Sequence, residues 1–282
     1  MSSTDQSSLS CGISFKGQHL PDIVQTKPEV GWFELHPENY FVDGGPRHTA
    51  LTALRESYPL SLHGVSLSLG GADPVDDAQL MALQELVQRY EPMFVSDHLA
   101  WCKTAGEYFP DLLPVPLTHE ALQRVCDNVD RTQEVLGRQI FVENPSSYIA
   151  FAQSELPEAD FLQSVVRKTG CKLLLDINNI YVSAENLGFS AQDYVDAVPP
   201  EMIGEVHLAG HALDTAAPER ILIDDHGSSV GAEVWALFER LCTRVGSGAS
   251  FATLVEWDTN VPELSVLVDE ARKADAVIRQ CR

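Results

Sequence analysis

The stretch Lys172–Tyr181, KLLLDINNIY, is the starting point for interpreting this chain. Three leucines, Leu173–Leu175, precede Asp176, and this short continuous apolar run predicts a strand that is buried on both faces. Asp176 falls where that strand should end, with two asparagines just beyond it. Because a buried carboxylate is costly unless a cation meets it, we expect a cation at this strand end.

The same arrangement recurs along the chain. At least six strand-like runs each end in a histidine or a carboxylate, and in a parallel barrel such ends lie at one mouth. The pattern therefore predicts a parallel barrel with a metal site at that mouth. The residues concerned are His63 in LSLHG, Asp97 and His98 in FVSDH, Glu143 in IFVENP, Asp176 in KLLLDI, His207 and His211 in IGEVHLAGH, and Glu256 in TLVEWD.

Strand and helix signals alternate from start to end, in eight units of roughly 35 residues, the usual spacing of a (β/α)8 TIM barrel. An open doubly wound sheet is disfavoured, because it would gather its polar residues at one switch point. We expect a disordered tail over residues 1–10, one TIM-barrel domain over 11–282, and two long irregular loops, 99–117 and 209–228. The expected strands are CGISF, VGWFELH, PLSLHGVSL, PMFVSDH, QIFVEN, KLLLDI, MIGEVHL and ATLVEW, and the main helices are 46–57, 74–90, 118–136, 161–169, 191–198, 232–245 and 262–280.

Composition excludes several classes of function. Lys plus Arg number 19 and Asp plus Glu number 41, which gives a net charge of −22. So acidic a chain is a poor nonspecific ligand for nucleic acid or an anionic membrane. Its polar N-terminus lacks the features of a signal peptide, so a cytoplasmic location is expected. Six scattered cysteines without a C-x-x-C pair argue against an iron–sulfur cluster, a zinc ribbon or a disulfide framework.

The candidate ligands combine imidazole with carboxylate and include no thiolate, which suits iron, manganese or zinc. Asp224 and His226 in IDDHG extend the set from the second long loop. Each residue alone has an ordinary structural explanation, such as a satisfied core histidine or an ion pair. Together they exceed what one ion uses, so two or three ions are expected. Further contributions, as ligands or as neighbours of ligands, are open for Glu34, His36 and Glu38 in FELHPENY.

From the ligands alone, two other functions stay open. One is a metal-dependent hydrolase or isomerase of the xylose-isomerase type or of the three-zinc endonuclease type, in which a metal-bound hydroxide attacks. The other is a non-catalytic barrel that stores or senses metal. Dependence on O2 and ferrous iron would separate an oxidative enzyme from both.

The combined motifs resemble the multinuclear non-heme iron-dependent oxidative enzymes, the family that includes the oxidase of methanobactin biosynthesis. The resemblance runs from about residue 11 to residue 270. It implies that His63, His98 and Glu143 hold one iron, that Glu143, Asp176, His207 and Glu256 surround another, and that Asp224 and His226 hold a third, with Asn178 close by and His211 as a further ligand or a neighbour of one. The motifs are GWFELHPENYF, LHGVSLSLGG, VSDHLAW, FVENPSSY, LLDINNIYV, EVHLAGH, the D-x-H of Asp224–His226 and LVEWD.

The resemblance also implies an activity. Such enzymes use mixed Fe(II)/Fe(III) centres and O2 to modify cysteine in ribosomally made precursor peptides, commonly with a separate partner protein that presents the peptide. Glu143, Asp176 and His207 would lie at the catalytic centre. We expect the two long loops to form the peptide groove, with Trp101, Tyr108 and Phe109 as contacts, although packing of loop aromatics would explain these three residues equally well.

Overall fold

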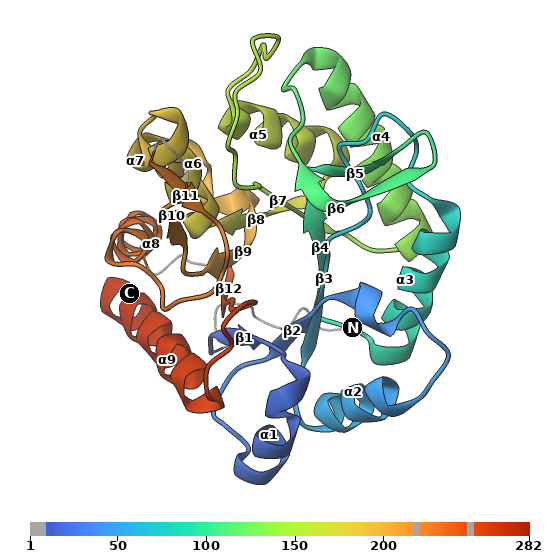
Figure 1. The fold of residues 1–282 in the computed structure, drawn as a ribbon, viewed down its shortest axis with the longest axis vertical. Coiled ribbons are helices and arrows are strands. Elements are labelled where there is room, and N and C mark those ends of the chain that lie inside the picture. The colour runs from blue at the N-terminus through green and yellow to red at the C-terminus, as the bar shows by residue number, and fades with distance from the viewer. Residues whose placement is uncertain (1–9, 217–219, 247–250) are drawn as a thin grey trace. The chain divides into compact units, whose positions relative to one another are not determined.

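A computed structural model describes residues 10–216, 220–246 and 251–282 of the chain. Eight strands form a closed parallel barrel in the order β1-β12-β9-β8-β7-β4-β3-β2 (Figure 1), which confirms the predicted (β/α)8 TIM barrel. Residues 1–9 of the expected tail lie outside the described residues. The barrel strands are β1 (Gly12–Ser14), β2 (Phe33–Leu35), β3 (Leu60–Gly64), β4 (Phe94–His98), β7 (Phe141–Glu143), β8 (Lys172–Asp176), β9 (Ile203–Leu208) and β12 (Ala252–Val255).

Contacts group the residues into two compact units. The first unit comprises the described residues of 10–34, 146–148 and 175–282, and the second comprises 35–145 and 149–174. Helices of the first unit are α1 (Leu20–Thr26), α6 (Ile177–Leu187), α7 (Ala191–Ala197), α8 (Ala232–Val245) and α9 (Leu264–Cys281), and those of the second are α2 (Pro46–Ser57), α3 (Asp77–Tyr90), α4 (His119–Leu136) and α5 (Glu158–Thr169).

Helix ends follow the sequence signals closely. The hydroxyl of Thr118 accepts the backbone N–H of Ala121 at 3.1 Å, so this residue caps α4. At the other end, Gly137 takes the left-handed conformation that stops the helix. Gly170 ends α5 in the same way, so this helix stops at Thr169, where the expected range also ended. The helix after Pro74 begins later than expected, because Asp76 caps it and α3 starts at Asp77.

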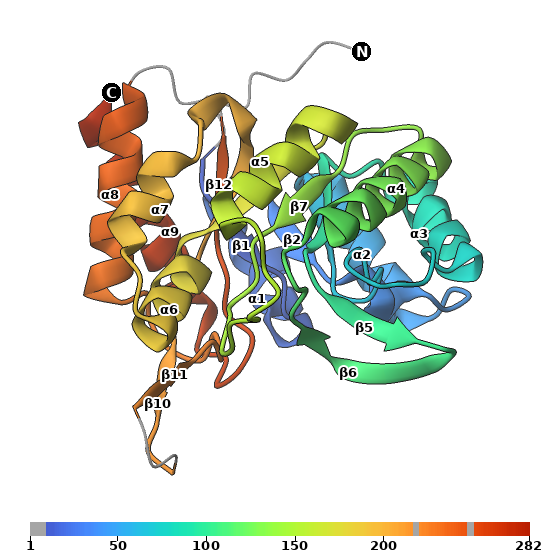
Figure 2. The same ribbon diagram turned by 90° about the horizontal axis from the view of Figure 1, so that it is seen from above.

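The stretch over 99–117, expected to be irregular, instead contains an antiparallel hairpin. Strands β5 (Trp101–Thr104) and β6 (Glu107–Leu113) pair across the turn at Ala105 and Gly106 (Figure 2). Both turn residues have positive φ, 50° and 83°. A two-residue turn of this kind matches the twist of the flanking strands, which explains why the chain pairs here.

The stretch over 209–228 was also expected to be irregular and also contains a hairpin, β10 (Ala212–Asp214) with β11 (Ile221–Ile223). Asn186 of α6 fixes it, because its side-chain amide donates to the carbonyl of Leu222 at 3.0 Å and accepts the N–H of the same residue at 2.9 Å. In Figure 2 this hairpin extends from the end of α6. The loop that follows it carries Asp224 and His226.

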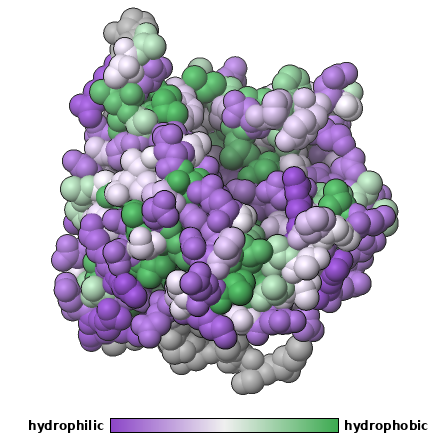
Figure 3. Space-filling model, turned by 60° about the horizontal axis from the view of Figure 1, so that its bottom comes forward, coloured by the Kyte–Doolittle hydropathy of each residue, from purple (hydrophilic) through white to green (hydrophobic). Residues whose placement is uncertain are grey.

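Helix α6 is the other element that the sequence did not predict. It begins directly after β8, with no intervening loop, because Asp176 itself serves as its cap. Gly188, with a φ of 76°, ends it. Among the helices of the described residues, none is long and apolar enough to cross a membrane. One face of the molecule carries many hydrophilic side chains (Figure 3), in keeping with the charge of −22.

Candidate metal centre

In the second unit, three parallel strands bring two histidines to one carboxylate. His63 lies near the end of β3, His98 ends β4, and Glu143 ends β7, where the strand register places it beside His98. The Nε2 atoms of the two histidines lie 3.1 Å and 3.2 Å from the same Oε2 atom of Glu143. All three side chains are buried. The structure therefore brings these three predicted ligands together.

The hydrogen bonds of this group determine which imidazole atoms face inward. Nδ1 of His98 lies 3.1 Å from the carbonyl oxygen of Gly64, which can only accept, so Nδ1 carries the proton. Nδ1 of His63 lies 2.8 Å from the hydroxyl of Ser96. In the neutral ring of His98, Nε2 thus presents a lone pair to a carboxylate oxygen. Two lone-pair atoms at this distance repel each other unless a proton or a metal ion lies between them. Two histidine nitrogens that converge on one carboxylate oxygen form a donor set that fits a metal ion.

In the first unit, His207 of β9 is surrounded by carboxylates. Its Nε2 lies 3.0 Å from Glu34 Oε1 and 3.4 Å from Glu205 Oε1, and its Nδ1 lies 3.1 Å from Glu256 Oε2. Burial acts to lower the pKa of His207, but Glu34 and the hydrogen bonds with Glu205 and Glu256 outweigh it and raise that pKa well above its usual value. Even a protonated imidazole leaves this buried group with excess negative charge, which a metal ion would balance.

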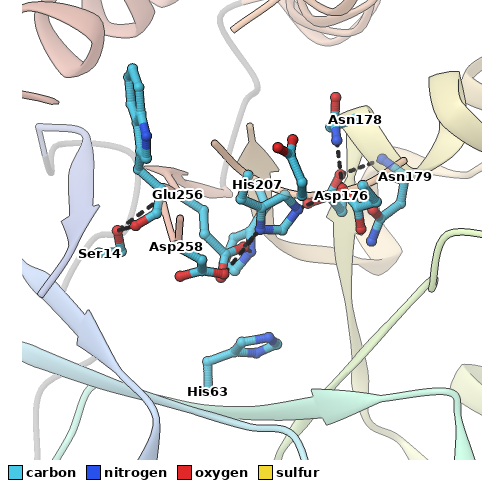
Figure 4. Close-up of polar contacts among 12 residues, drawn as sticks. Ser14, His63, Asp176, Asn178, Asn179, His207, Glu256 and Asp258 are labelled. Carbon is cyan, nitrogen blue, oxygen red and sulfur yellow. Dashed lines mark hydrogen bonds and ion pairs between the residues drawn. The ribbon is translucent and has the colours of Figure 1, made fainter. Parts of the chain in front are cut away.

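Glu256 links His207 to a second histidine. Nδ1 of His226 lies 3.5 Å from Glu256 Oε2 and 3.1 Å from Asp258 Oδ2, and its Nε2 lies 2.6 Å from Asp224 Oδ1. Burial and Asp258 act to raise the pKa of Glu256, but the two histidines hold it below its usual value. Ser14 of β1 exchanges hydrogen bonds with the backbone of Trp257, which holds Glu256 and Asp258 on either side of it (Figure 4).

Asn178 and His211 lie beside this group. The amide nitrogen of Asn178 donates to Asp224 Oδ1 at 2.7 Å, and its carbonyl oxygen lies 2.8 Å from Nδ1 of His211. That oxygen can only accept, so His211 donates to it and supports Asn178. His211 thus orients Asn178, and its Nδ1 is not available to bind an ion.

Asp176 is completely buried, and one of its oxygens has a structural role. Oδ1 accepts the backbone N–H of Asn179 at 2.6 Å, at the first turn of α6 (Figure 4). The partial positive charge of the helix N-terminus stabilises the carboxylate. The sequence predicted a cation here because a buried carboxylate is costly, and this contact offsets part of that cost. It engages only one of the two oxygens.

Three participants carry weaker sequence signals. Glu205 precedes His207 by two residues, and this spacing puts both side chains on one face of a strand. Asp258 follows Glu256 by two residues beyond β12. Glu34, for which the sequence left the role open, lies directly against His207. A search limited to polar residues at strand ends misses Glu205, which lies in the middle of its strand.

The three predicted contact aromatics lie on the β5–β6 hairpin. Trp101 and Phe109 meet edge to face at 5.8 Å between ring centroids. Phe109 is 40% exposed and Tyr108 58% exposed. A cavity of about 510 Å³ lies beside Trp101, between the hairpin and the start of α4, and its lining includes Gly70, Lys103, Val115, Ala121 and Arg124. The hairpin therefore presents aromatic surface next to a recess.

The structure is similar to barrel enzymes of known structure. D-psicose 3-epimerase in the presence of D-fructose aligns with a TM-score of 0.62 at 12% identity, over 97% of this chain and 99% of that one. Endonuclease IV from Thermus thermophilus aligns with a TM-score of 0.57 at 16% identity, over 96% and 99%. At such low identity these similarities show the fold alone.

Sequence comparison is more specific. UPF0276 proteins are 46% identical in Caulobacter vibrioides, over 95% of both chains, and 48% identical in Caulobacter sp. strain K31, over 96% and 97%. The UPF0276 protein RB0508 of Rhizobium meliloti is 47% identical, over 95% of this chain and 86% of that one. A family model described as RiPP precursor modification enzyme MbnB/TglH/ChrH matches residues 10–279. The chain thus belongs to the MbnB/TglH/ChrH family of enzymes that modify ribosomally made precursor peptides.

Proposed function

We propose that this protein is a cytoplasmic iron- and O2-dependent enzyme that oxidises cysteine residues in a ribosomally made precursor peptide. The observation that carries the proposal is the convergence of His63 and His98 on one oxygen of Glu143, since such an arrangement calls for a cation. Membership in the MbnB/TglH/ChrH family supports a precursor peptide as the substrate. Nitrogen and oxygen donors without thiolate suit iron.

We assign ligands within each unit. In the second unit, His63, His98 and Glu143 would hold one ion. In the first unit, His207, Glu256 and Asp176 would contribute to another, and Asp224, His226 and Asn178 to a third. His211 would orient Asn178 rather than bind through Nδ1. When bound, the irons would supply a binding site for the substrate thiolate and the one-electron chemistry that O2 requires.

The chain's own residues prepare this chemistry. The Gly64 carbonyl and the Ser96 hydroxyl fix the rings of His98 and His63 before any ion arrives. Burial of the ligands keeps water from the reacting thiolate. Catalysis would centre on Glu143, Asp176 and His207, which donate to the ions. Trp101, Tyr108 and Phe109 would contact the peptide, and a separate partner protein would present it.

Metal analysis of anaerobically purified protein tests the proposal. We expect two to three irons per chain by elemental analysis, with a mixed-valent coupled pair in the Mössbauer spectrum of iron-57 protein. Zinc or manganese in place of iron, with no reaction toward O2, would instead support a hydrolase or isomerase. Stoichiometric release of metal without turnover would support a storage or sensing role.

A thiolate probe tests substrate binding without knowledge of the peptide. N-acetylcysteine amide added to the anaerobic iron protein should produce a visible thiolate-to-iron charge-transfer band, because thiolate binds ferric iron directly. The serine analogue is the matched control and should leave the spectrum unchanged. Identical spectra with both compounds would contradict cysteine as the reacting residue.

A further inference from the structure

A chain of polar contacts in the first unit extends well beyond the expected ligands. It begins at Lys16, whose ammonium contacts Asp258 Oδ1. The other oxygen of Asp258 lies 3.1 Å from Nδ1 of His226, and Nε2 of His226 lies 2.6 Å from Asp224 Oδ1. Two members of this chain, Lys16 and Asp258, belong to no ligand set assigned above.

The backbone of His226 is strained. Its φ is 45°, in the left-handed region that a residue with a side chain rarely adopts. Its carbonyl oxygen accepts the backbone N–H of Asp258 at 2.8 Å and that of Thr259 at 3.3 Å. The neighbouring Gly227 is closely packed, so that a methyl group there would crowd the hydroxyl of Thr259. Strain that surrounding contacts maintain in this way is characteristic of functional positions.

We infer that Asp258, itself held by Lys16, is a positioning residue that keeps the proton of His226 on Nδ1 and presents Nε2 to a metal ion beside Asp224. This inference rests on the metal-binding part of the proposed function and not on its oxidative chemistry. Asp258 would hold His226 in two ways, because its backbone N–H donates to the backbone carbonyl of His226 and its carboxylate accepts from Nδ1 of the imidazole. Carboxylate partners of this kind set the tautomer and orientation of metal-binding histidines.

The charges on the two sides of the imidazole decide which nitrogen faces the ion. The Nδ1 side already holds a cation, Lys16, which neutralises Asp258. A metal ion placed there would be repelled by that ammonium. On the Nε2 side, Asp224 Oδ1 accepts from Asn178, and Asn178 in turn accepts from His211. Glu256 also lies on the Nδ1 side, but at 3.5 Å it is a weaker acceptor than Asp258 at 3.1 Å.

Nitrogen NMR on histidine-labelled protein reads the tautomer directly, with Zn(II) as a diamagnetic probe. The His226→Gln variant identifies the signals of His226. We expect the zinc-loaded protein to show a protonated Nδ1 and a metal-bound Nε2. A metal-bound Nδ1 with the proton on Nε2 would overturn the assignment.

The iron affinity of variants measures how much the Lys16–Asp258 pair contributes to metal binding. The probe is ferrous iron, bound anaerobically. We expect Asp258→Ala to lower the affinity for one equivalent of iron by about 10- to 100-fold and to leave the affinity for the other equivalents unchanged. Lys16→Met should lower that affinity by a smaller factor. Lys16→Arg should bind iron as the wild type does, because Arg keeps the cation. A purely structural role for the pair would lower thermal stability without selectively weakening the binding of one equivalent of iron.

The control is a second lysine–aspartate pair, Lys103 with Asp76, which ends on the N-terminus of α3 and reaches no histidine. Asp76→Ala should lower thermal stability and leave iron affinity unchanged. Equal affinity in the wild type and Asp258→Ala, or equal losses in Asp258→Ala and Asp76→Ala, would overturn the inference. Wild-type protein that binds no metal would overturn both the inference and the proposed function, whereas a wild type that binds zinc but not iron would remove only the oxidative chemistry.

Discussion

Gly64 packs directly against Asp97, so that a methyl group at Gly64 would overlap with Oδ2 of that carboxylate. Asp97 is buried and its pKa is raised to about 7, first by burial and then by the neighbouring charge of Glu38. Its two oxygens accept the backbone N–H groups of His98 and Leu67. The same Gly64 supplies the carbonyl that orients the ring of His98. Packing at one glycine is therefore tied to the direction of a metal ligand.

The first prediction follows from that contact. Gly64→Ala should destabilise the fold by about 1–3 kcal/mol, the usual cost of forcing an extra methyl into a packed site. It should also lower the affinity for the ion held by His63, His98 and Glu143, because displacement of Asp97 disturbs the backbone of His98. Urea unfolding and iron titration measure the two effects. The control is Gly17→Ala, where a methyl group would meet open space. Unchanged iron affinity in Gly64→Ala would show that His98 is held by other contacts.

The second prediction concerns the ligands themselves. Single alanine substitutions at His63, Glu143, Asp176, His207 and Glu256 should each lower bound iron and abolish activity. We expect the fold to survive, because these five residues lie at or near strand ends and are polar, so their removal leaves the apolar core of the barrel in place. Circular dichroism and elemental analysis on the same samples separate the two effects. Full iron occupancy in Glu143→Ala and Asp176→Ala would contradict the proposed ligand sets.

The third prediction separates the two roles of Asp176. Serine at this position keeps a side-chain oxygen that can cap α6, whereas alanine loses both the cap and the carboxylate. Asp176→Ser and Asp176→Ala should therefore lose iron equally. Measured without metal, the alanine variant should be less stable than the serine variant by roughly 1 kcal/mol. Equal stability of the two variants would mean that the contact with Asn179 does not stabilise the helix.

The fourth prediction concerns the β5–β6 hairpin. Because Tyr108 and Phe109 are exposed and lie outside the ligand sets, replacing both with alanine should leave iron content unchanged. Thermal stability should fall only by the loss of the contact between Phe109 and Trp101. Affinity for the precursor peptide should fall by roughly tenfold or more, since exposed aromatics act as anchors in such interfaces. The matched control replaces exposed Val24 of α1. Equal peptide affinity in the hairpin variant and the wild type would mean that peptide binding does not depend on these two aromatics.

The fifth prediction concerns the protein's own thiols. Burial raises the pKa of Cys126 and Cys171 to about 11 and that of Cys242 to about 12, so these thiols should be unreactive near neutral pH. Cys11 and Cys102 are also buried, and Cys281 is partly exposed. A disulfide reagent should therefore label one thiol in the native protein and six in denaturant. Rapid labelling of Cys102 in the native state would mark it as a reactive group instead.

Much of the site was accessible from the sequence because of one simple regularity. In parallel strands the polar residue that ends an apolar run marks the mouth of the barrel, and His63, His98, Glu143 and Asp176 all lie at or near such ends in the structure. The same regularity could not find Glu205, which lies mid-strand. Lys16 carries no local signal, because its contact with Asp258 joins residues 242 positions apart.

The elements that the sequence missed are short or begin without a loop. The β5–β6 hairpin depends on a turn at Ala105 and Gly106, and Ala is an uncommon residue at a position with positive φ. Helix α6 starts at the very residue that ends β8. An aspartate between an apolar run and two asparagines resembles the start of a loop, and only its bond to the Asn179 N–H distinguishes it as a cap.

Asp176 also bears on how this protein can change over time. One carboxylate oxygen caps the N-terminus of α6, and the same carboxylate is a proposed metal ligand. A mutation that removes the carboxylate removes the metal ligand. It also removes the cap of α6, unless the new side chain can itself cap a helix. Loss of catalysis at this position would thus tend to pass through asparagine or serine. Descendants that have given up the chemistry but kept the barrel should be recognisable by those two residues.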